Sequence, residues 1–283
     1  MAQPIRRKRT IKKSKPRFFG KWFFVVFSFF LFLIVLIGIY KFHDGFLYYL
    51  GFKTDKYVNE LTADERKLAD IRIYEVLQKH DDKAIGFDVS EYQSEIDWEQ
   101  TYHIDESFEL SFVFIRATAG KDRVDSQFEE NWKGAKARQL IRGAYHYYRP
   151  NENSIEQAEN FIKNVRLKKG DLPPVLDIEK LPKSQSIDSL KIGLRRWLEK
   201  VEKHYKVKPI IYSGESYYTD FLKEEFSEYP LWIANYNFWR NDLESDWQFW
   251  QFTEKAQIEG VNGMVDVNIF NGDKNKLLLK CIQ

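Results

Sequence analysis

The sequence predicts an α/β protein whose main domain is an eight-stranded barrel. Strand-like and helix-like patterns alternate through five units from about Ala84 to Phe221, and three strand-like stretches with only loops between them follow. Alternating strands and helices are typical of a parallel sheet with helices outside it, and eight such strands favour a closed barrel. We therefore expect an irregular TIM-like (β/α)5(β)3 barrel over residues 84–283, preceded by one N-terminal transmembrane helix.

Charge is distributed unevenly along the chain. The 283 residues carry a formal charge of +2, from 44 Lys or Arg against 42 Asp or Glu. Residues 1–21 contain nine of the basic residues and no acid, which leaves 35 basic residues against 42 acids in the remainder. Domains that bind nucleic acid present a basic face. An acidic body behind a basic leader therefore argues against nucleic acid as a partner.

An uncharged run from Trp22 to Tyr40 follows the basic segment, with Lys21 and Lys41 on either side. Its length suits the hydrocarbon core of a bilayer, and aromatic side chains at both ends are typical of the membrane interface. The competing interpretation is a cleaved secretory signal, but the run is long for one and no small-residue cleavage site follows it. We expect an uncleaved signal anchor over residues 22–40, with residues 1–21 in the cytoplasm and the rest outside.

Residues 41–83 are interpreted as a connector without chemistry of its own. Apolar residues recur at roughly helical spacing after Thr62, among charged residues. Thr62 and Glu65 stand three positions apart, as in a capping box, where each side chain accepts a hydrogen bond from the backbone of the other residue. The pattern predicts a helix that serves as a stalk or as a docking helix.

The elements of the predicted barrel follow one another with clear boundaries. Turn residues and prolines separate short apolar stretches, which favour strands, from longer stretches with helical spacing. Strands are expected at 85–88, 112–116, 141–148, 172–179, 209–213, 230–234, 247–253 and 265–270, and helices at about 126–139, 155–165 and 190–201.

Two carboxylates stand at alternate positions near the end of the stretch 172–179. Side chains alternate faces along a strand, so Asp177 and Glu179 point the same way. Like charges this close resist joint ionisation, so one acid tends to keep its proton. We expect the pKa of Glu179 to lie above its ordinary value of about 4.3, because of this crowding and of partial burial. A carboxylic acid that is protonated near neutral pH can donate a proton in catalysis.

Further acids are predicted near the same place. In a barrel of this class the C-terminal ends of the strands share one face and carry the active site. Asp88 ends the first predicted strand, as Asp177 and Glu179 end the fourth. Asp266 stands instead at the start of the last strand, which does not fit a parallel arrangement. Converging carboxylates suit glycoside hydrolysis, which needs one protonated acid and one ionised carboxylate around a cation-like transition state.

Aromatic residues, 17% of the chain, supply candidates for the walls of a sugar-binding site. Each of them is individually more typical of a core residue than of a wall. The candidates are Tyr145, Tyr147, Tyr148, Tyr212, Trp232, Tyr236, Trp247 and Trp250.

No metal or cofactor is expected. None of the five histidines is spaced from an acid as in a His-Glu-x-x-His helix, and His146 among tyrosines is more typical of a hydrogen-bonded core residue. No Gly-x-Ser-x-Gly elbow and no glycine-rich phosphate loop occurs, and the single cysteine, Cys281, is not placed as a nucleophile.

Eight short motifs follow one another along the predicted barrel. They are Gly86-Phe-Asp-Val-Ser90, Phe112-Val-Phe-Ile-Arg-Ala-Thr118, Gly143-Ala-Tyr-His146, Pro174-Val-Leu-Asp-Ile-Glu179, Ile211-Tyr212, Leu231-Trp-Ile-Ala234, Trp250-Gln251 and Asp266-Val-Asn268. In content and order the stretch from about residue 84 to 274 resembles the family 25 glycoside hydrolases, the lysozymes of the Chalaropsis type.

The resemblance implies hydrolysis of the β-1,4 bond between N-acetylmuramic acid and N-acetylglucosamine in peptidoglycan, with retention of configuration. It implies that Glu179 is the general acid and Asp177 its partner, acting as a direct nucleophile or through the acetamido group of the substrate. Asp88 and Asp266 correspond to supporting acids, and the closing strands need not all be parallel. The implied substrate-binding residues are Tyr145, Tyr212, Trp232, Gln251 and Asn268.

Two alternatives stay open beside this interpretation. A non-catalytic glycan-binding module would tether the envelope to the wall, although it would have no use for a protonatable Glu179. A hydrolase of another N-acetylated glycan, such as chitin, would need the same acids. With the signal anchor, the first expectation is a single-pass protein of the bacterial cytoplasmic membrane whose catalytic domain trims cell-wall peptidoglycan on the extracytoplasmic side.

Overall fold

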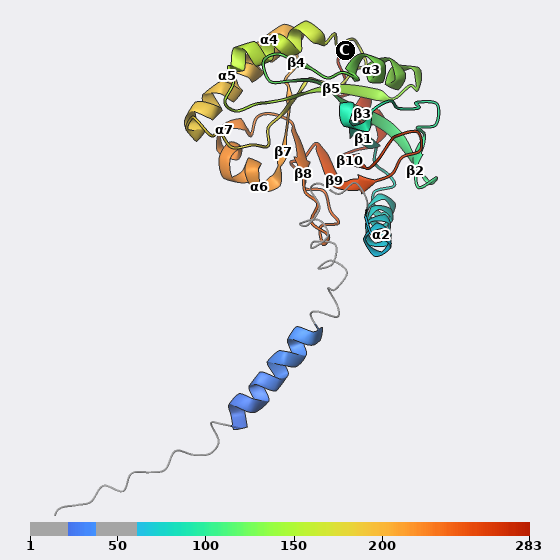
Figure 1. Cartoon of the computed structure of the whole chain (residues 1–283), viewed down its shortest axis with the longest axis vertical. Helices are drawn as coiled ribbons and strands as arrows, with labels where there is room; N and C mark the ends of the chain where they lie inside the picture. The colour runs from blue at the N-terminus through green and yellow to red at the C-terminus, as the bar shows by residue number, and fades with distance from the viewer. Residues whose placement is uncertain (1–21, 38–60) are drawn as a thin grey trace, which may run out of the picture. The chain divides into compact units, whose positions relative to one another are not determined.

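The computed structural model describes residues 22–37 and 61–283 (Figure 1). The chain divides into two units, Met1–Leu47 and Tyr48–Gln283. Of the first unit, residues 22–37 form a helix whose side chains are mostly exposed. Within the described ranges, no helix combines the length and the apolar character needed to cross a membrane. The predicted membrane span, the basic segment before it and much of the connector extend beyond the described residues and stay predictions.

Eight strands of the second unit close into a barrel, as the sequence predicts. Neighbours follow the order β1-β10-β9-β8-β7-β6-β5-β3, and pairing of β3 with β1 closes the ring. The strands are β1 (Ile85–Val89), β3 (Phe108–Ala119), β5 (Ile141–Tyr147), β6 (Val175–Asp177), β7 (Ile210–Gly214), β8 (Leu231–Ala234), β9 (Phe249–Ala256) and β10 (Val265–Phe270). Two short strands that were not predicted, β2 (His103–Ile104) and β4 (Arg123–Val124), pair with the ends of β3.

β10 runs antiparallel to both of its neighbours, β1 and β9, whereas the other neighbouring barrel strands run parallel. The start of β10 therefore lies at the end of the barrel where the parallel strands finish. In the register Asp266 stands opposite Asp88. The position of Asp266 at the beginning of a strand, which does not fit a parallel arrangement, is explained by this reversal.

Helices cover the outside of the parallel strands (Figure 1). Full helices follow β3, β5 and β6, and only short helical turns follow β7. The first predicted strand–helix unit lacks a full helix, because β1 is followed by the three-residue 3-10 helix Glu91–Gln93. The helices are α3 (Phe128–Ala137), α4 (Ser154–Asn164), α5 (Ile187–Tyr205), α6 (Glu215–Tyr217), η2 (Tyr218–Leu222), α7 (Lys223–Phe226) and the C-terminal α8 (Lys274–Leu278).

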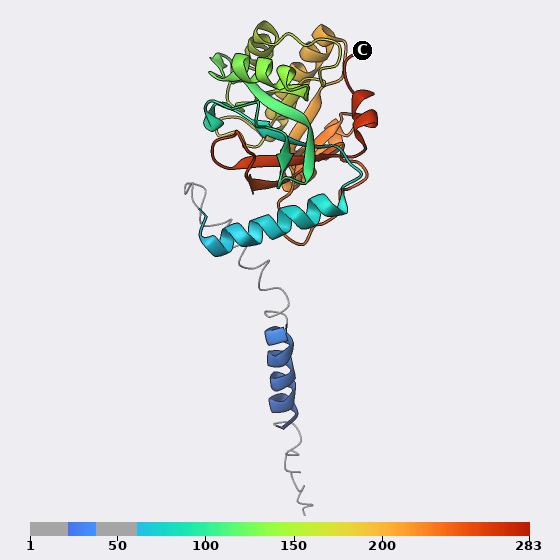
Figure 2. The ribbon, with the colours of Figure 1, turned by 90° about the vertical axis from the view of Figure 1, so that its right-hand side faces the viewer.

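α2 (Ala63–Lys79) packs against β9, on the part of the barrel whose strands have no helix of their own (Figure 2). The predicted capping box is confirmed, because the Thr62 backbone N–H donates to Glu65 Oε2 at 2.9 Å and the Glu65 N–H donates to Thr62 Oγ1 at 3.3 Å. Val76 of α2 is buried in the same hydrophobic core as Trp250 of β9. Of the two roles expected for this segment, the structure therefore has the docking helix.

Aromatic side chains fill the inside of the barrel. Phe114 and Trp232 stack with their ring centroids 4.3 Å apart, and Phe112 and Phe249 pack against each other at 5.4 Å. α8 adds Leu277 to the same cluster. A barrel interior packed in this way is a core and not a channel. A site can therefore form only at the rim, and the carboxylates are placed at the end where the parallel strands finish.

Gly86 lies in β1 where Phe112 of β3 occupies the space that a side chain would need. An added Cβ would lie 2.5 Å from both the ring and the backbone oxygen of Phe112. We expect Gly86→Ala to lower the free energy of unfolding by about 1–3 kcal/mol, because overpacking forces the strands or the ring to shift. Thermal unfolding measures the loss.

Gly214→Ala is the matched control for this prediction. Nothing lies within 4 Å of the Cβ position at Gly214, and its φ of −64° suits any residue. A melting temperature of Gly86→Ala equal to that of the parent would contradict the close packing of β1 on β3.

Candidate active site

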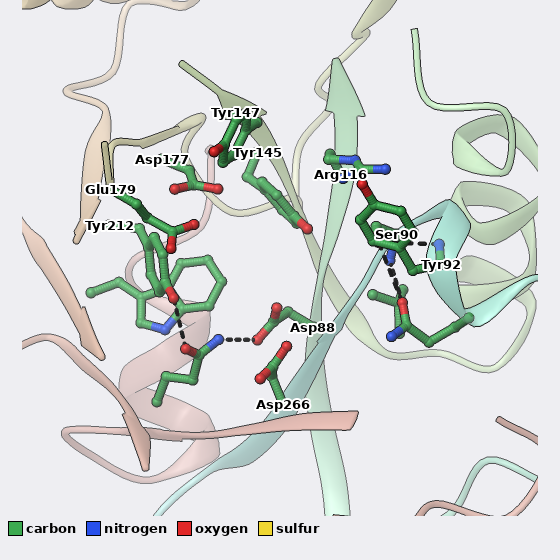
Figure 3. Close-up of a pocket in the computed structure, with 14 residues that line it drawn as sticks. Asp88, Ser90, Tyr92, Arg116, Tyr145, Tyr147, Asp177, Glu179, Tyr212 and Asp266 are labelled. Atoms are coloured by element: carbon green, nitrogen blue, oxygen red, sulfur yellow. Dashed lines mark hydrogen bonds between the residues drawn. The ribbon is translucent and has the colours of Figure 1, made fainter. Parts of the chain in front are cut away.

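Four carboxylates meet at the end of the barrel where the parallel strands finish (Figure 3). Asp88 comes from β1, Asp177 is the last residue of β6, and Asp266 comes from β10. Glu179 follows β6 two positions after Asp177. All four line one cavity of about 200 Å³. The structure therefore brings together the four acids that were predicted from the sequence.

The four acids differ in exposure. Asp177 and Asp88 are buried, with 4% and 7% of their surface exposed, and Asp266 is half-buried. Glu179 is exposed, because β6 ends at Asp177 and Glu179 lies beyond the last strand residue, at the rim. The partial burial expected for Glu179 is therefore wrong, and its partner Asp177 is the enclosed member of the pair.

Two amide side chains hold Asp88. Gln251 Nε2 and Asn268 Nδ2 each donate to Asp88 Oδ2 at 2.8 Å. Hydrogen bonds to the amide oxygens set the orientation of both side chains. Tyr212 Oη donates to Gln251 Oε1 and Trp232 Nε1 donates to Asn268 Oδ1, each at 2.7 Å. An indole N–H can only donate, so it keeps the amide group of Asn268 turned towards Asp88.

Burial raises the pKa of three of these acids. It raises the pKa of Asp88 to about 7, with the charge of Glu179 adding to the shift and the hydrogen bonds from Asn268 and Gln251 opposing it. It raises the pKa of Asp177 well above the ordinary value, and the charge of Glu179 acts in the same direction. The pKa of Asp266 is raised by burial and by the charge of Asp88. The enclosed acids therefore bind protons more tightly than free carboxyl groups do.

One oxygen of Asp177 is left for a ligand. Asp177 Oδ1 is buried and has no hydrogen-bond partner in the part of the chain that the structure describes. Buried polar atoms in folded proteins are nearly always paired, so an exception calls for an explanation. An oxygen in this state, at the wall of a cavity, is suited to receive a group of the substrate.

The backbone around Glu179 is held on both sides. Ser213 Oγ donates to the carbonyl oxygen of Ile178 at 2.7 Å, and Tyr217 Oη donates to that of Lys180 at 3.1 Å. The Ile178 N–H also continues the strand pairing by donating to the Tyr212 carbonyl at 3.0 Å. The position of the exposed Glu179 is therefore determined by its neighbours, although it lies beyond the end of β6.

Four of the five predicted substrate-binding residues line the cavity: Tyr145, Tyr212, Trp232 and Gln251. The fifth, Asn268, lies behind the wall with no exposed surface and contacts Asp88 and Trp232. Trp232 is only 2% exposed and belongs mainly to the aromatic core. Three of the aromatic wall candidates are core residues away from the cavity: Tyr148, Trp247 and Trp250.

Five residues that were not selected as site residues from the sequence also line the cavity: Val89, Ser90, Tyr92, Gln93 and Arg116. Tyr92 is 78% exposed, and the guanidinium carbon of Arg116 lies 4.7 Å from the centroid of its ring. The sequence held a signal for Arg116, because it ends the predicted strand 112–116 as Asp88 ends the first strand. No comparable pattern marks Tyr92, which is placed by the 3-10 turn after β1.

A second cavity of about 490 Å³ adjoins the first. Glu179 and Tyr212 line both cavities, so the two lie next to each other with Glu179 in the wall that they share, and together they are called the groove. The walls of the second cavity come from the segments that follow β7 and β8. They are residues 214–217 and 234–237.

His146 is the hydrogen-bonded core residue that was expected. Its Nδ1 lies 2.7 Å from Thr118 Oγ1 and its Nε2 lies 3.2 Å from Gln157 Oε1, and burial lowers its pKa to about 3. Across residues 22–37 and 61–283, no group of three or more His, Cys, Asp or Glu is arranged to hold a metal ion.

A closed barrel with paired carboxylates at the C-terminal ends of its strands is typical of glycoside hydrolases. The model of the family described as "Glycosyl hydrolases family 25" matches residues 87–261, and the chain belongs to that family. The protein is thus an enzyme of the lysozyme type that hydrolyses O-glycosyl bonds, which confirms the resemblance read from the motifs.

Relatives and a solved structure support this assignment. The chain is 42% identical over 194 residues to YegX of Escherichia coli (strain K12), across 68% of this chain and 71% of YegX. It is 33% identical over 208 residues to Lysozyme M1 of Streptomyces globisporus, across 68% and 69% of the two chains. A family 25 glycosyl hydrolase from Bacillus anthracis has a similar fold, with a TM-score of 0.63 and 30% identity over 71% of this chain and 94% of that one.

The raised pKa values predict how stability depends on pH. A carboxyl group whose pKa is higher in the folded state than in the unfolded state favours folding in acid, and this contribution is lost as the pH rises through the folded pKa. With Asp88 at about 7 in the folded protein and an ordinary value of about 3.9, the melting temperature should fall between about pH 4 and pH 7. Thermal unfolding across this range measures the fall.

Asp177→Asn should reduce this fall, because one enclosed group can then no longer ionise. Asp122→Asn, which removes an exposed carboxylate between β3 and β4, is the control and should leave the pH dependence unchanged. A pH dependence in Asp177→Asn as steep as in the parent would mean that Asp177 does not bind its proton more tightly in the folded state.

Proposed function

We propose that the protein is a membrane-anchored N-acetylmuramidase that cleaves the β-1,4 bond between N-acetylmuramic acid and N-acetylglucosamine of peptidoglycan, with retention of configuration. The observation that carries the proposal is the pair formed by the enclosed Asp177 and the exposed Glu179 at the end of one strand. Glycosidases need an acid that protonates the leaving oxygen and a second carboxylate that faces the developing cation. The similarity to Lysozyme M1 supports peptidoglycan as the substrate.

Glu179 is the general acid in this proposal. It stands between the two cavities, so a glycan lying along the groove has one sugar on each side of it. The bond between those sugars is then within reach of the Glu179 carboxyl group. The proton passes from Glu179 to the bridging oxygen, the bond from that oxygen to the anomeric carbon breaks, and the leaving sugar departs with a hydroxyl group.

Asp177 faces, in its ionised form, the positive charge that develops on the remaining sugar. Burial and the charge of Glu179 raise the pKa of Asp177 in the free protein, whereas a positive charge nearby favours the ionised form. Its free Oδ1 is available either to the anomeric carbon or to the acetamido N–H of the same sugar, and both routes retain the configuration. The protonation state of Asp88 and Asp266 sets how much negative charge surrounds Asp177. Because burial raises the pKa of both, they add less negative charge to the pocket than ordinary carboxylates would.

Glu179→Gln should abolish turnover while the fold stays intact. Glutamine keeps the size of the side chain but has no proton to give, and a general acid contributes about 10²- to 10⁴-fold. Release of reducing ends from purified peptidoglycan measures the rate, with chitin as a parallel substrate. Faster release from chitin by the parent would reassign the substrate to another N-acetylated glycan.

Glu199→Gln, on the exposed face of α5, is the control for this experiment and should cleave as the parent does. Cleavage by Glu179→Gln at the rate of the parent would remove Glu179 from its assigned role. Binding of peptidoglycan by the parent without any release of reducing ends would favour a glycan-binding tether.

The proposed anchor is the uncharged run 22–40 behind nine basic residues. Basic residues stay on the cytoplasmic side, so the catalytic domain is assigned to the extracytoplasmic side of the bacterial cytoplasmic membrane, where peptidoglycan lies. The lack of charged residues over this run, between Lys21 and Lys41, supports the proposal.

Protease added outside intact spheroplasts should therefore digest the catalytic domain and leave a small basic fragment in the membrane. Antibodies against the two ends of the chain follow both parts, and a cytoplasmic protein that stays intact is the control. Protection of residues 84–283 would contradict the orientation and remove peptidoglycan as an accessible substrate.

A further inference from the structure

α2 lies outside the residues that the family model matches, yet it belongs to the barrel. The match covers residues 87–261, whereas α2 ends at Lys79. The strands near β9 have no helices of their own, and α2 packs against β9 there. Arg66 adds a hydrogen bond of 2.7 Å from its Nη1 to the carbonyl oxygen of Lys255 in β9. The helix thus takes the place that a following helix would have in a complete barrel.

Arg72, in the middle of α2, is only 1% exposed. Its guanidinium group donates to three oxygens of the loop between β8 and β9, here called the β8–β9 loop (residues 235–248). They are the carbonyl oxygen of Asn237, at 3.3 Å, the carbonyl oxygen of Arg240 and Oδ1 of Asn241. A buried cation is costly unless hydrogen bonds satisfy it. The loop backbone is therefore held where its oxygens meet Arg72.

Residues at the end of α2 add to this contact. His80 is buried, which lowers its pKa, so the ring is neutral at pH 7 and donates from Nε2 to the Asn241 carbonyl at 3.0 Å. Lys79 and Asp242 form an exposed ion pair of 2.7 Å. Exposed ion pairs contribute little to stability, so Arg72 and His80 carry most of the attachment.

The same loop reaches the catalytic groove through its first residues. Tyr236 donates from Oη to Gln251 Oε1, and Gln251 Nε2 donates to Asp88 at 2.8 Å. Asn235, Tyr236 and Asn237 line the cavity next to Glu179. Asn237 therefore takes part in both contacts, since it lines the groove and its carbonyl oxygen accepts from Arg72.

We propose that Arg72 is a positioning residue for the substrate groove: from α2 it holds the β8–β9 loop in the conformation that forms the wall beside Glu179. The part of the inference that concerns glycan binding rests on the proposed function, which places a glycan in that groove. The acids Asp88, Asp177 and Glu179 come from other segments, β1 and β6 with the residues that follow it. Gln251, which contacts both Tyr236 and Asp88, is also held by Tyr212 of β7. Loss of Arg72 should therefore weaken glycan binding far more than it slows bond cleavage.

The test compares Arg72→Met with Arg66→Met in the full chain. Methionine keeps an apolar stem in each place and removes the donors, but only Arg72 contacts the loop. Backbone hydrogen exchange over residues 235–242 should become faster in Arg72→Met and stay at the parent rate in Arg66→Met. For soluble peptidoglycan fragments, Arg72→Met should raise KM about five- to tenfold, as expected for one or two lost contacts, with little change in kcat.

Two further variants keep the test decisive. Arg72→Lys retains the charge and serves if the methionine variant does not fold. It should show a smaller increase in KM than Arg72→Met, because an ammonium group still donates hydrogen bonds, although it cannot reproduce the fork of a guanidinium. Asn241→Ala removes one acceptor, and its effect on KM should not add to that of Arg72→Met, since both break the same contact.

Unchanged exchange over residues 235–242, or a lower melting temperature with the KM of the parent, would overturn the role of Arg72. A parent enzyme that does not cleave peptidoglycan would instead overturn the proposed substrate. In that case the exchange comparison between the two arginine variants still decides whether Arg72 holds the loop.

Discussion

The antiparallel pairing of β10 with β1 is the constraint on which the catalytic end of the barrel depends. Together with the pairing of β1 with β3 it completes the ring of strands, and its register places Asp266 opposite Asp88. The barrel interior below is filled by stacked aromatic rings, so the acids cannot move deeper and are held in the wall of the mouth. Their burial, and with it the upward shift of their pKa values, follows from this closure.

Among the described residues, neutral amide donors and not a cation hold Asp88 in place. Gln251 and Asn268 donate to one of its oxygens, and rings from the barrel wall fix the orientation of both amides. Neutral donors lower the pKa less than a nearby guanidinium would. Asp88 therefore keeps a firm position while its proton stays exchangeable near neutral pH, a combination that an ion pair would not allow.

Most of the barrel strands and two of the four acids could be predicted because they follow local sequence patterns. The barrel strands are short apolar runs between turn residues, and Asp88 and Asp177 stand at strand ends, where parallel strands share a face. The direction of β10 is not a local property. The residues alone therefore did not explain the place of Asp266, which follows from the strand pairing. The exposure of Glu179 depends on β6 ending two residues earlier than the apolar pattern indicates. In the sequence Arg72 is one of several charged residues of an amphipathic helix. Its contacts with the β8–β9 loop arise only in the folded chain and could not be predicted.

The helix α2 has a consequence for what counts as the catalytic domain. The family model matches the chain from residue 87, but the part that folds together extends back to the cap of α2 at Thr62. The matched region and the folding unit thus differ in length in this protein. The helix that precedes the matched region contacts the β8–β9 loop, and that loop lines the groove, so α2 cannot be exchanged or removed as an inert spacer.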